Sequence, residues 1–95
     1  MTNMKVKQSV EYEGKKIPLP FLIAKETLNT DMTKVRNRFN GNETELPEFA
    51  VAVYDVIKGS ELFYNNGNFK MATIINKGRY WFQKYFIKEY YTLLD

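Results

Sequence analysis

The feature that most constrains the fold is the last stretch of the chain, Phe69 to Asp95, in which apolar side chains recur at helical spacing. On an ideal helix, with about 100° between successive residues, a set of apolar or small residues falls on one side. They follow the i, i+3, i+4, i+7 steps of an amphipathic helix, and they are Met71, Ile74, Ile75, Gly78, Phe82, Tyr85 and Phe86, with Trp81 at the edge. The spacing predicts a helix from Phe69 to Phe86.

Glu89 opposes a continuous helix to the C-terminus, because it would point into the middle of the apolar side. A buried carboxylate without a partner is costly. We therefore expect a break near Ile87 and a separate last turn or two from Lys88 to Leu94. In that arrangement Glu89 lies in a first helical turn, where a negative charge suits the helix macrodipole.

The composition removes most catalytic chemistry. The 95 residues include no Cys and no His, which excludes disulfides, thiol nucleophiles, imidazole bases and zinc sites of Cys/His type. We expect a binding protein and not an enzyme, with no cofactor; carboxylate-only catalysis by a buried Glu89 is the remaining enzymatic alternative. The spacing of Glu43, Glu45 and Glu48 fits no EF-hand loop, so we expect no metal site.

A chain of this length is expected to form a single domain, residues 1–95. No apolar run reaches the roughly 18 to 20 residues that span a bilayer, and the N-terminus lacks the apolar region of a signal peptide. We therefore expect a cytoplasmic protein that does not enter membranes. The net charge is +3, and the charged residues are unevenly distributed: both ends of the chain are basic, and residues 43–61 are acidic. This distribution fits either internal charge matching or a basic patch for an anionic partner.

The N-terminal part predicts a β-hairpin. Apolar and polar residues alternate from Met4 to Tyr12, apart from a break at Gln8, and the alternation resumes from Ile17 to Phe21. Between these runs, Gly14 supplies the positive φ that a type II′ turn needs. The prolines of the second run cannot donate ladder hydrogen bonds, so its strand must be short and lie at an edge.

Two short helices are expected next. The stretch from Phe21 to Leu28 suits either one or two helical turns or a continuation of the second strand, and we favour the helical turns. Thr30-Asp31 supplies N-cap chemistry for a helix from Met32 to Asn40, whose apolar residues stand at i, i+3 and i+7. Gly41 suits the left-handed position after the end of that helix.

A longer helix follows. Thr44 to Glu48 has the capping residue, the acids and the early proline of a helix start. The helix ends at Gly59 or continues to Phe63, and an Asn-rich turn then returns the chain into the C-terminal helix; short connections leave helices as antiparallel neighbours. The expected fold is α+β and mostly helical: an N-terminal β-hairpin followed by three or four helices, the last two long ones an antiparallel pair. The residues expected to be most buried are Phe49, Ala52, Val53, Val56 and Ile57.

The run LPEFAVAVYDVIKGSEL, a turn, and GRYWFQKYFIKEYYTLLD at the C-terminus together resemble small uncharacterised open reading frames of bacteriophages and prophages. The resemblance covers roughly the second half of the chain, contains no catalytic motif and transfers no functional residue. It implies a context only, since small accessory phage proteins often act by binding host or phage factors.

The candidate binding surface is a set of interleaved aromatic and basic residues: Lys77, Arg79, Tyr80, Trp81, Lys84, Lys88, Tyr90 and Tyr91. Single-stranded nucleic-acid sites use such sets, because bases stack on rings while cations follow phosphates. Protein interfaces also favour exposed Tyr and Trp. In the other interpretation, the aromatics are core and the lysines an ordinary solvated face. We expect a protein partner from host or phage, because the net charge is modest and the acidic central segment would repel a long anionic ligand. A homodimer and a nucleic acid are the alternatives.

Overall fold

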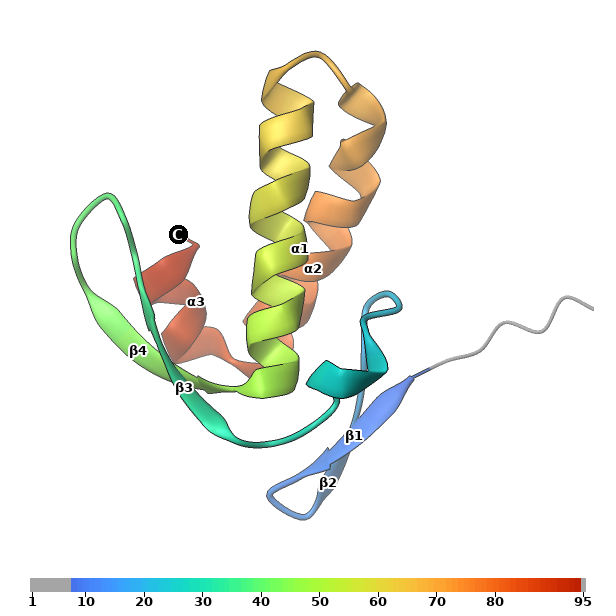
Figure 1. The fold of residues 1–95 in the computed structure, drawn as a ribbon, viewed down its shortest axis with the longest axis vertical. Helices are drawn as coiled ribbons and strands as arrows, with labels where there is room; N and C mark the ends of the chain where they lie inside the picture. The colour runs from blue at the N-terminus through green and yellow to red at the C-terminus, as the bar shows by residue number, and fades with distance from the viewer. Residues whose placement is uncertain (1–7, 95) are drawn as a thin grey trace, which may run out of the picture.

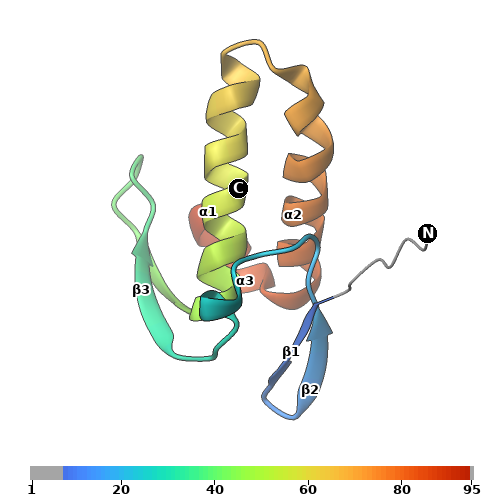
Figure 2. The same cartoon turned by 45° about the vertical axis from the view of Figure 1, so that its right-hand side comes forward.

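The computed structural model describes residues 8–94, and its longest helix, α1 (Glu48–Asn65), is the element around which the others are arranged (Figure 1). α2 (Ala72–Tyr85) lies beside α1 in both views, after the chain reverses direction in a short turn (Figures 1 and 2). The prediction of an α+β fold with an N-terminal hairpin followed by helices is confirmed. The remaining elements are β1 (Ser9–Tyr12), β2 (Lys15–Pro18), the 3-10 turn η1 (Lys25–Thr27), β3 (Met32–Arg36), β4 (Glu43–Pro47), the 3-10 turn η2 (Phe69–Met71) and α3 (Ile87–Leu93).

The C-terminal helix and its break are both confirmed. The helix starts as η2 and continues as α2. Phe86 follows directly with φ −140° and ψ 57°, which ends the helical path, while its N–H still donates to the oxygen of Phe82 at 2.8 Å. α3 begins at Ile87, and Glu89 lies half-buried in its first turn. The bend therefore keeps this carboxylate out of the apolar interior.

The start of α1 differs from the prediction. Thr44 lies within β4, and α1 begins only at Glu48. The free N–H groups of Glu48 and Phe49 donate to the carbonyl oxygens of Asp31 and Asn29, at 2.8 and 3.1 Å. The backbone of the loop before β3 caps the helix, and no side-chain hydrogen bond does so.

The predicted helix from Met32 to Asn40 is wrong, because this segment forms a second hairpin. β3 pairs antiparallel with β4, with Arg36 opposite Glu43 and Lys34 opposite Glu45. Opposite charges directly across an antiparallel pair stabilise it. In both views this hairpin flanks α1 on the side away from α2 (Figures 1 and 2).

The half-buried side chains of β3 follow the two-residue alternation of a strand and not the three- to four-residue spacing of a helix. Thr33 and Val35 are half-buried, and β-branched residues suit a pleated surface. The outer members of the supposed helical stripe face solvent instead, Met32 being 52% and Phe39 93% exposed. Gly41 does have positive φ, 76°, but it serves a hairpin loop and not a helix end.

β1 and β2 confirm the predicted hairpin within the described residues; the start of the predicted first strand, from Met4, lies outside them. The register leaves Glu13-Gly14 as a two-residue loop. Both residues have positive φ, 51° and 78°, which makes a type I′ turn and not the predicted type II′ turn. β2 ends at Pro18 in a two-stranded sheet, so the prediction of a short edge strand is confirmed.

One helical turn forms between Phe21 and Leu28, namely η1. The residues before it are held by Gln8, where the strand alternation breaks. Its side-chain Oε1 accepts from the N–H of Ile23 at 2.8 Å, and its Nε2 donates to the oxygen of Ile23 at 2.9 Å. Gln8 thereby fastens the loop to the first hairpin.

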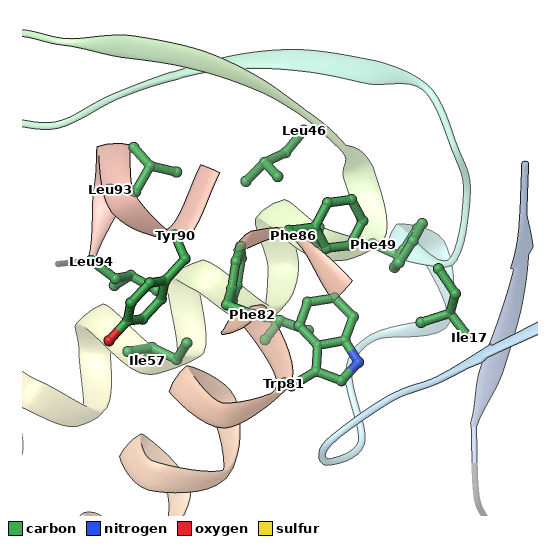
Figure 3. Packing of buried hydrophobic residues seen from close by; sticks show 12 residues of the cluster. Ile17, Leu46, Phe49, Ile57, Trp81, Phe82, Phe86, Tyr90, Leu93 and Leu94 are labelled. Carbon is green, nitrogen blue, oxygen red and sulfur yellow. The ribbon is translucent and has the colours of Figure 1, made fainter. Parts of the chain in front are cut away.

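The core lies where the three helices and both hairpins meet (Figure 3). Its centre is Phe49, whose ring centroid is 5.6 Å from that of Tyr12, 6.1 Å from that of Trp81 and 6.0 Å from that of Phe86. Aromatic pairs at these separations contribute beyond the area that they bury. The buried hydrophobic residues are Ile17, Leu46, Phe49, Ala50, Val53, Ile57, Trp81, Phe82, Phe86, Tyr90, Leu93 and Leu94.

α1 buries only part of its predicted stripe. Phe49, Val53 and Ile57 are fully buried, as predicted. Ala52 and Val56 are half-buried and line a hollow next to η1. One side of α1 therefore belongs to the core, and a second, partly apolar side faces outward.

Candidate binding surfaces

Two residues of the predicted C-terminal binding surface are core residues. Trp81 and Tyr90 are both buried (Figure 3). The indole Nε1 of Trp81 donates to the oxygen of Pro18 at 2.7 Å, which fastens α2 to β2. The hydroxyl of Tyr90 accepts from Nη2 of Arg79 at 3.0 Å, and the guanidinium carbon lies 5.4 Å from the ring centroid. The rings of Trp81 and Tyr90 are enclosed by the protein, so neither is presented to a partner.

Arg79 connects all three helices. Besides its bond to Tyr90 on α3, its Nη1 lies 3.7 Å from Oε2 of Glu61 on α1. Lys58, one turn earlier on α1, places its Nζ 3.0 Å from the other oxygen of the same carboxylate. The charge of Arg79 is thus matched within the protein, and its role in the structure is to hold the helices together.

The other predicted residues are exposed. Tyr80 and Tyr91 are 75% and 61% exposed. Lys77, Lys84 and Lys88 also face solvent. Because α2 ends before Phe86, this exposed set is divided between two helices, with Lys77, Tyr80 and Lys84 on α2 and Lys88 and Tyr91 on α3.

A groove that the sequence did not predict runs between the β3–β4 hairpin and α1. Its volume is about 750 Å³. The strand side consists of consecutive residues from Thr33 to Phe39, and the helix side comes from the outward face of α1. The helix residues that line it are Val51, Tyr54, Asp55, Lys58, Gly59, Glu61, Leu62 and Asn65.

Asn37 holds the hairpin beside the helices. It is buried, and its Nδ2 donates to the oxygen of Thr92 on α3 at 2.8 Å. Its Oδ1 accepts from the N–H of Phe39 at 2.9 Å, and its backbone N–H donates to the oxygen of Asn42 at 2.7 Å. One side chain thereby shapes the hairpin loop and anchors it to α3.

Apolar side chains stand at the rim of this groove. Phe39 is 93% exposed, and its ring centroid is 6.0 Å from Nζ of Lys58. Leu62, on the last turns of α1, is 67% exposed. A second hollow of about 570 Å³, lined by η1 and α1, shares Thr33, Val51 and Asp55 with the groove. The two hollows therefore adjoin each other at these three residues.

The groove carries charge of both signs. Lys34 and Arg36 on the strand side lie 4.0 and 3.4 Å from the carboxylate of Glu43, and Arg38 is exposed at the hairpin loop. On the helix side, Asp55 is exposed, and the partial burial of its carboxyl raises the pKa above its ordinary value.

The acidic residues do not assemble a metal site in the part of the chain that is described. Residues 8–94 contain no group of three acidic side chains that could hold a metal ion. Glu43 is engaged by Arg36, and Glu48 begins α1. Within the same residues no helix has the length and apolar character needed to cross a membrane.

No protein-family model, curated protein or solved structure matches this chain. The polar run Asn40-Gly41-Asn42 separates the segments that form β3 and β4. Such a composition suits a hairpin loop as well as a helix end, so it did not by itself distinguish the two.

Proposed function

We propose that this protein is a non-enzymatic binding module whose partner is another protein, and that the groove between the β3–β4 hairpin and α1 is its principal contact surface. The observation that carries the proposal is the pair of exposed apolar side chains, Phe39 and Leu62, at the rim of a partly apolar groove. Large apolar side chains exposed at the same groove indicate a site where another molecule packs. A binding module needs only a complementary patch, whereas catalysis needs a poised acid, base or nucleophile.

The exposed part of the predicted C-terminal surface provides a second candidate contact. Tyr80 and Tyr91 leave large rings in solvent, and Tyr is enriched among the residues that contribute most to protein interfaces. Lys77, Lys84 and Lys88 would then act as rim charges that raise the association rate more than the affinity. We regard α1 and α2 as an antiparallel pair that supports both surfaces rigidly.

A nucleic acid is the competing partner, favoured by the exposed Arg36, Arg38 and Phe39 at one hairpin end. Against it, the acids Glu43, Asp55 and Glu61 stand among the cations of the groove and its rim, so the surplus of positive charge there is small for following a phosphate chain. A protein from a phage or its host fits the resemblance of the C-terminal half, and a second copy of this chain is a further protein candidate.

The test is capture of partners from an extract of the cells in which the protein occurs, with and without nuclease. Phe39→Ser and Leu62→Ser should each abolish capture of a dominant, nuclease-insensitive protein. Tyr80→Ser is the comparison variant, because it removes a ring that is 75% exposed, against 93% for Phe39, and that lies outside the groove. If Tyr80→Ser abolishes capture and the groove variants do not, the C-terminal surface is the contact. If nuclease removes all partners, the nucleic-acid alternative replaces the proposal.

A further inference from the structure

The groove runs along an edge of β3 and not along one of its faces. Every residue from Thr33 to Phe39 lines it, and its lining includes no residue of β4. Since side chains of a strand alternate between two faces, such a consecutive run indicates that an edge borders the groove. Among residues 8–94, β3 pairs with β4 alone. The edge of β3 that borders the groove therefore has no strand partner there.

A free strand edge can take up an extended chain. Alternate N–H and C=O groups of an antiparallel strand point away from the existing partner, and peptide-binding domains use such groups to add a strand from the ligand. The groove provides the length: its lining on α1 runs from Val51 to Asn65, a rise of about 21 Å. An extended partner segment of about six residues, at roughly 3.3 Å per residue, would span it.

Basic residues make this edge selective. Lys34 and Arg36 are engaged by Glu43 only through exposed ion pairs, which are weak, and Arg38 has no ion pair among the described residues. A carboxylate on an added strand would meet these cations. A second copy of β3 would instead bring Lys and Arg against Lys and Arg, and like charges across a strand pair are destabilising.

The charge balance fits a peptide better than a nucleic acid. The surplus of positive charge is small and suits a segment with a few carboxylates, whereas binding of a phosphate chain rests on neutralising many phosphates. The groove and the ion pairs at its rim contain the cations Lys34, Arg36, Arg38, Lys58 and Arg79 and the acids Glu43, Asp55 and Glu61.

We propose that the groove receives an extended, acidic segment of a partner protein, which adds to the free edge of β3 as a third strand and packs apolar side chains against Phe39, Val51 and Leu62. This inference rests on the proposed protein-binding function and names the chemistry of the partner at the same groove.

The probe is a displayed library of random 12-residue peptides selected against the whole protein at 0.15 M salt. The selected peptides should combine acidic with apolar residues. Arg38→Glu should weaken their binding about fivefold, the effect of a pair of exposed charges, and Phe39→Ser about tenfold. Lys70→Glu is the matched control, because it reverses an exposed charge on η2 outside the groove, and it should change binding less than twofold.

A second measurement reads the backbone directly. Hydrogen exchange followed by NMR should show that a selected peptide protects amides of Met32 to Arg36 that exchange quickly in the free protein. Tight peptide binding without this protection overturns strand addition. The inference is overturned if the selected peptides lack acidic residues or if their binding does not respond to Arg38→Glu. It is also overturned if no peptide binds in a way that depends on the groove residues. Binding of a 15-nucleotide oligothymidylate that depends on Arg38 and Phe39 would also overturn the inference.

The failure of this inference is distinguishable from failure of the proposed function. If cellular capture depends on Phe39 and Leu62 while no acidic peptide binds, the groove is a protein site of another chemistry and only the inference is lost. If capture is also indifferent to Phe39 and Leu62, both are lost.

Discussion

Replacing Gly78 by alanine tests how closely α1 and α2 approach. A Cβ at Gly78 would lie 2.5 Å from Cγ1 and 2.7 Å from Cδ1 of Ile57. Ile57 is fully buried, so its side chain cannot move into solvent. Overpacking of this kind costs about 1–3 kcal/mol, and the better helix propensity of Ala returns up to about 1 kcal/mol. We expect a net loss of about 1 kcal/mol in the free energy of unfolding.

Gly59→Ala is the matched control, because Gly59 also lies inside a helix and a Cβ there would meet no atom within 4 Å. This variant should gain about 0.5–1 kcal/mol from helix propensity alone. For a chain of this size, 1 kcal/mol shifts Tm by roughly 4–8 °C. Thermal and urea unfolding followed by circular dichroism should therefore place the two variants on opposite sides of the wild type.

A double-mutant cycle identifies the cause. Ile57→Ala alone should cost about 2–5 kcal/mol through the cavity it leaves, and it should cost less in the Gly78→Ala background, where the new methyl group occupies part of that space. Such coupling is expected only for residues in contact. If Gly78→Ala stabilises the protein as much as Gly59→Ala does, the close packing of the two helices at this point is refuted.

Three further outcomes follow from the structure. Val53→Asp should lower the free energy of unfolding by about 3 kcal/mol or more, because it places a charge at a fully buried position; a variant that melts near the wild type would contradict the core assignment. Trp81→Phe should cost about 0.5–1.5 kcal/mol in urea unfolding, because it removes the hydrogen bond to the oxygen of Pro18, and an unchanged midpoint would show that this bond contributes nothing. Burial raises the pKa of Asp55 above 3.8, so its ionisation costs stability above the raised pKa, and this cost vanishes as the pH falls below the unfolded value. Asp55→Asn should accordingly raise Tm at pH 7 but not at pH 3, and equal effects at both pH values would exclude the titration of Asp55 as the cause.

The divided C-terminal surface shows the limit of a helical projection. The projection placed Trp81 at the edge of the apolar side, where it could serve either the core or a partner. The structure buries it against Phe49 and Phe86, and the oxygen of Pro18, 63 residues away in sequence, accepts its indole N–H. Tyr90 is buried beside Arg79 by a contact between two helices. Such partners are distant in sequence, so the periodicity of one helix cannot reveal them.

The amino-acid sequence by itself determined the helical second half and its bend. The apolar residues from Phe69 to Phe86 keep a period of 3.6 residues over several turns. A continuous helix would bury the carboxylate of Glu89 without a partner, which is costly. These are local properties, and the first hairpin likewise follows from alternation and Gly14. Only the tertiary structure decided that Met32 to Arg36 is a strand, since its short helical stripe competes with pairing to β4 and packing on α1. The groove exists for the same reason: its two walls come from segments that meet only in the fold, where Asn37 joins the hairpin to α3.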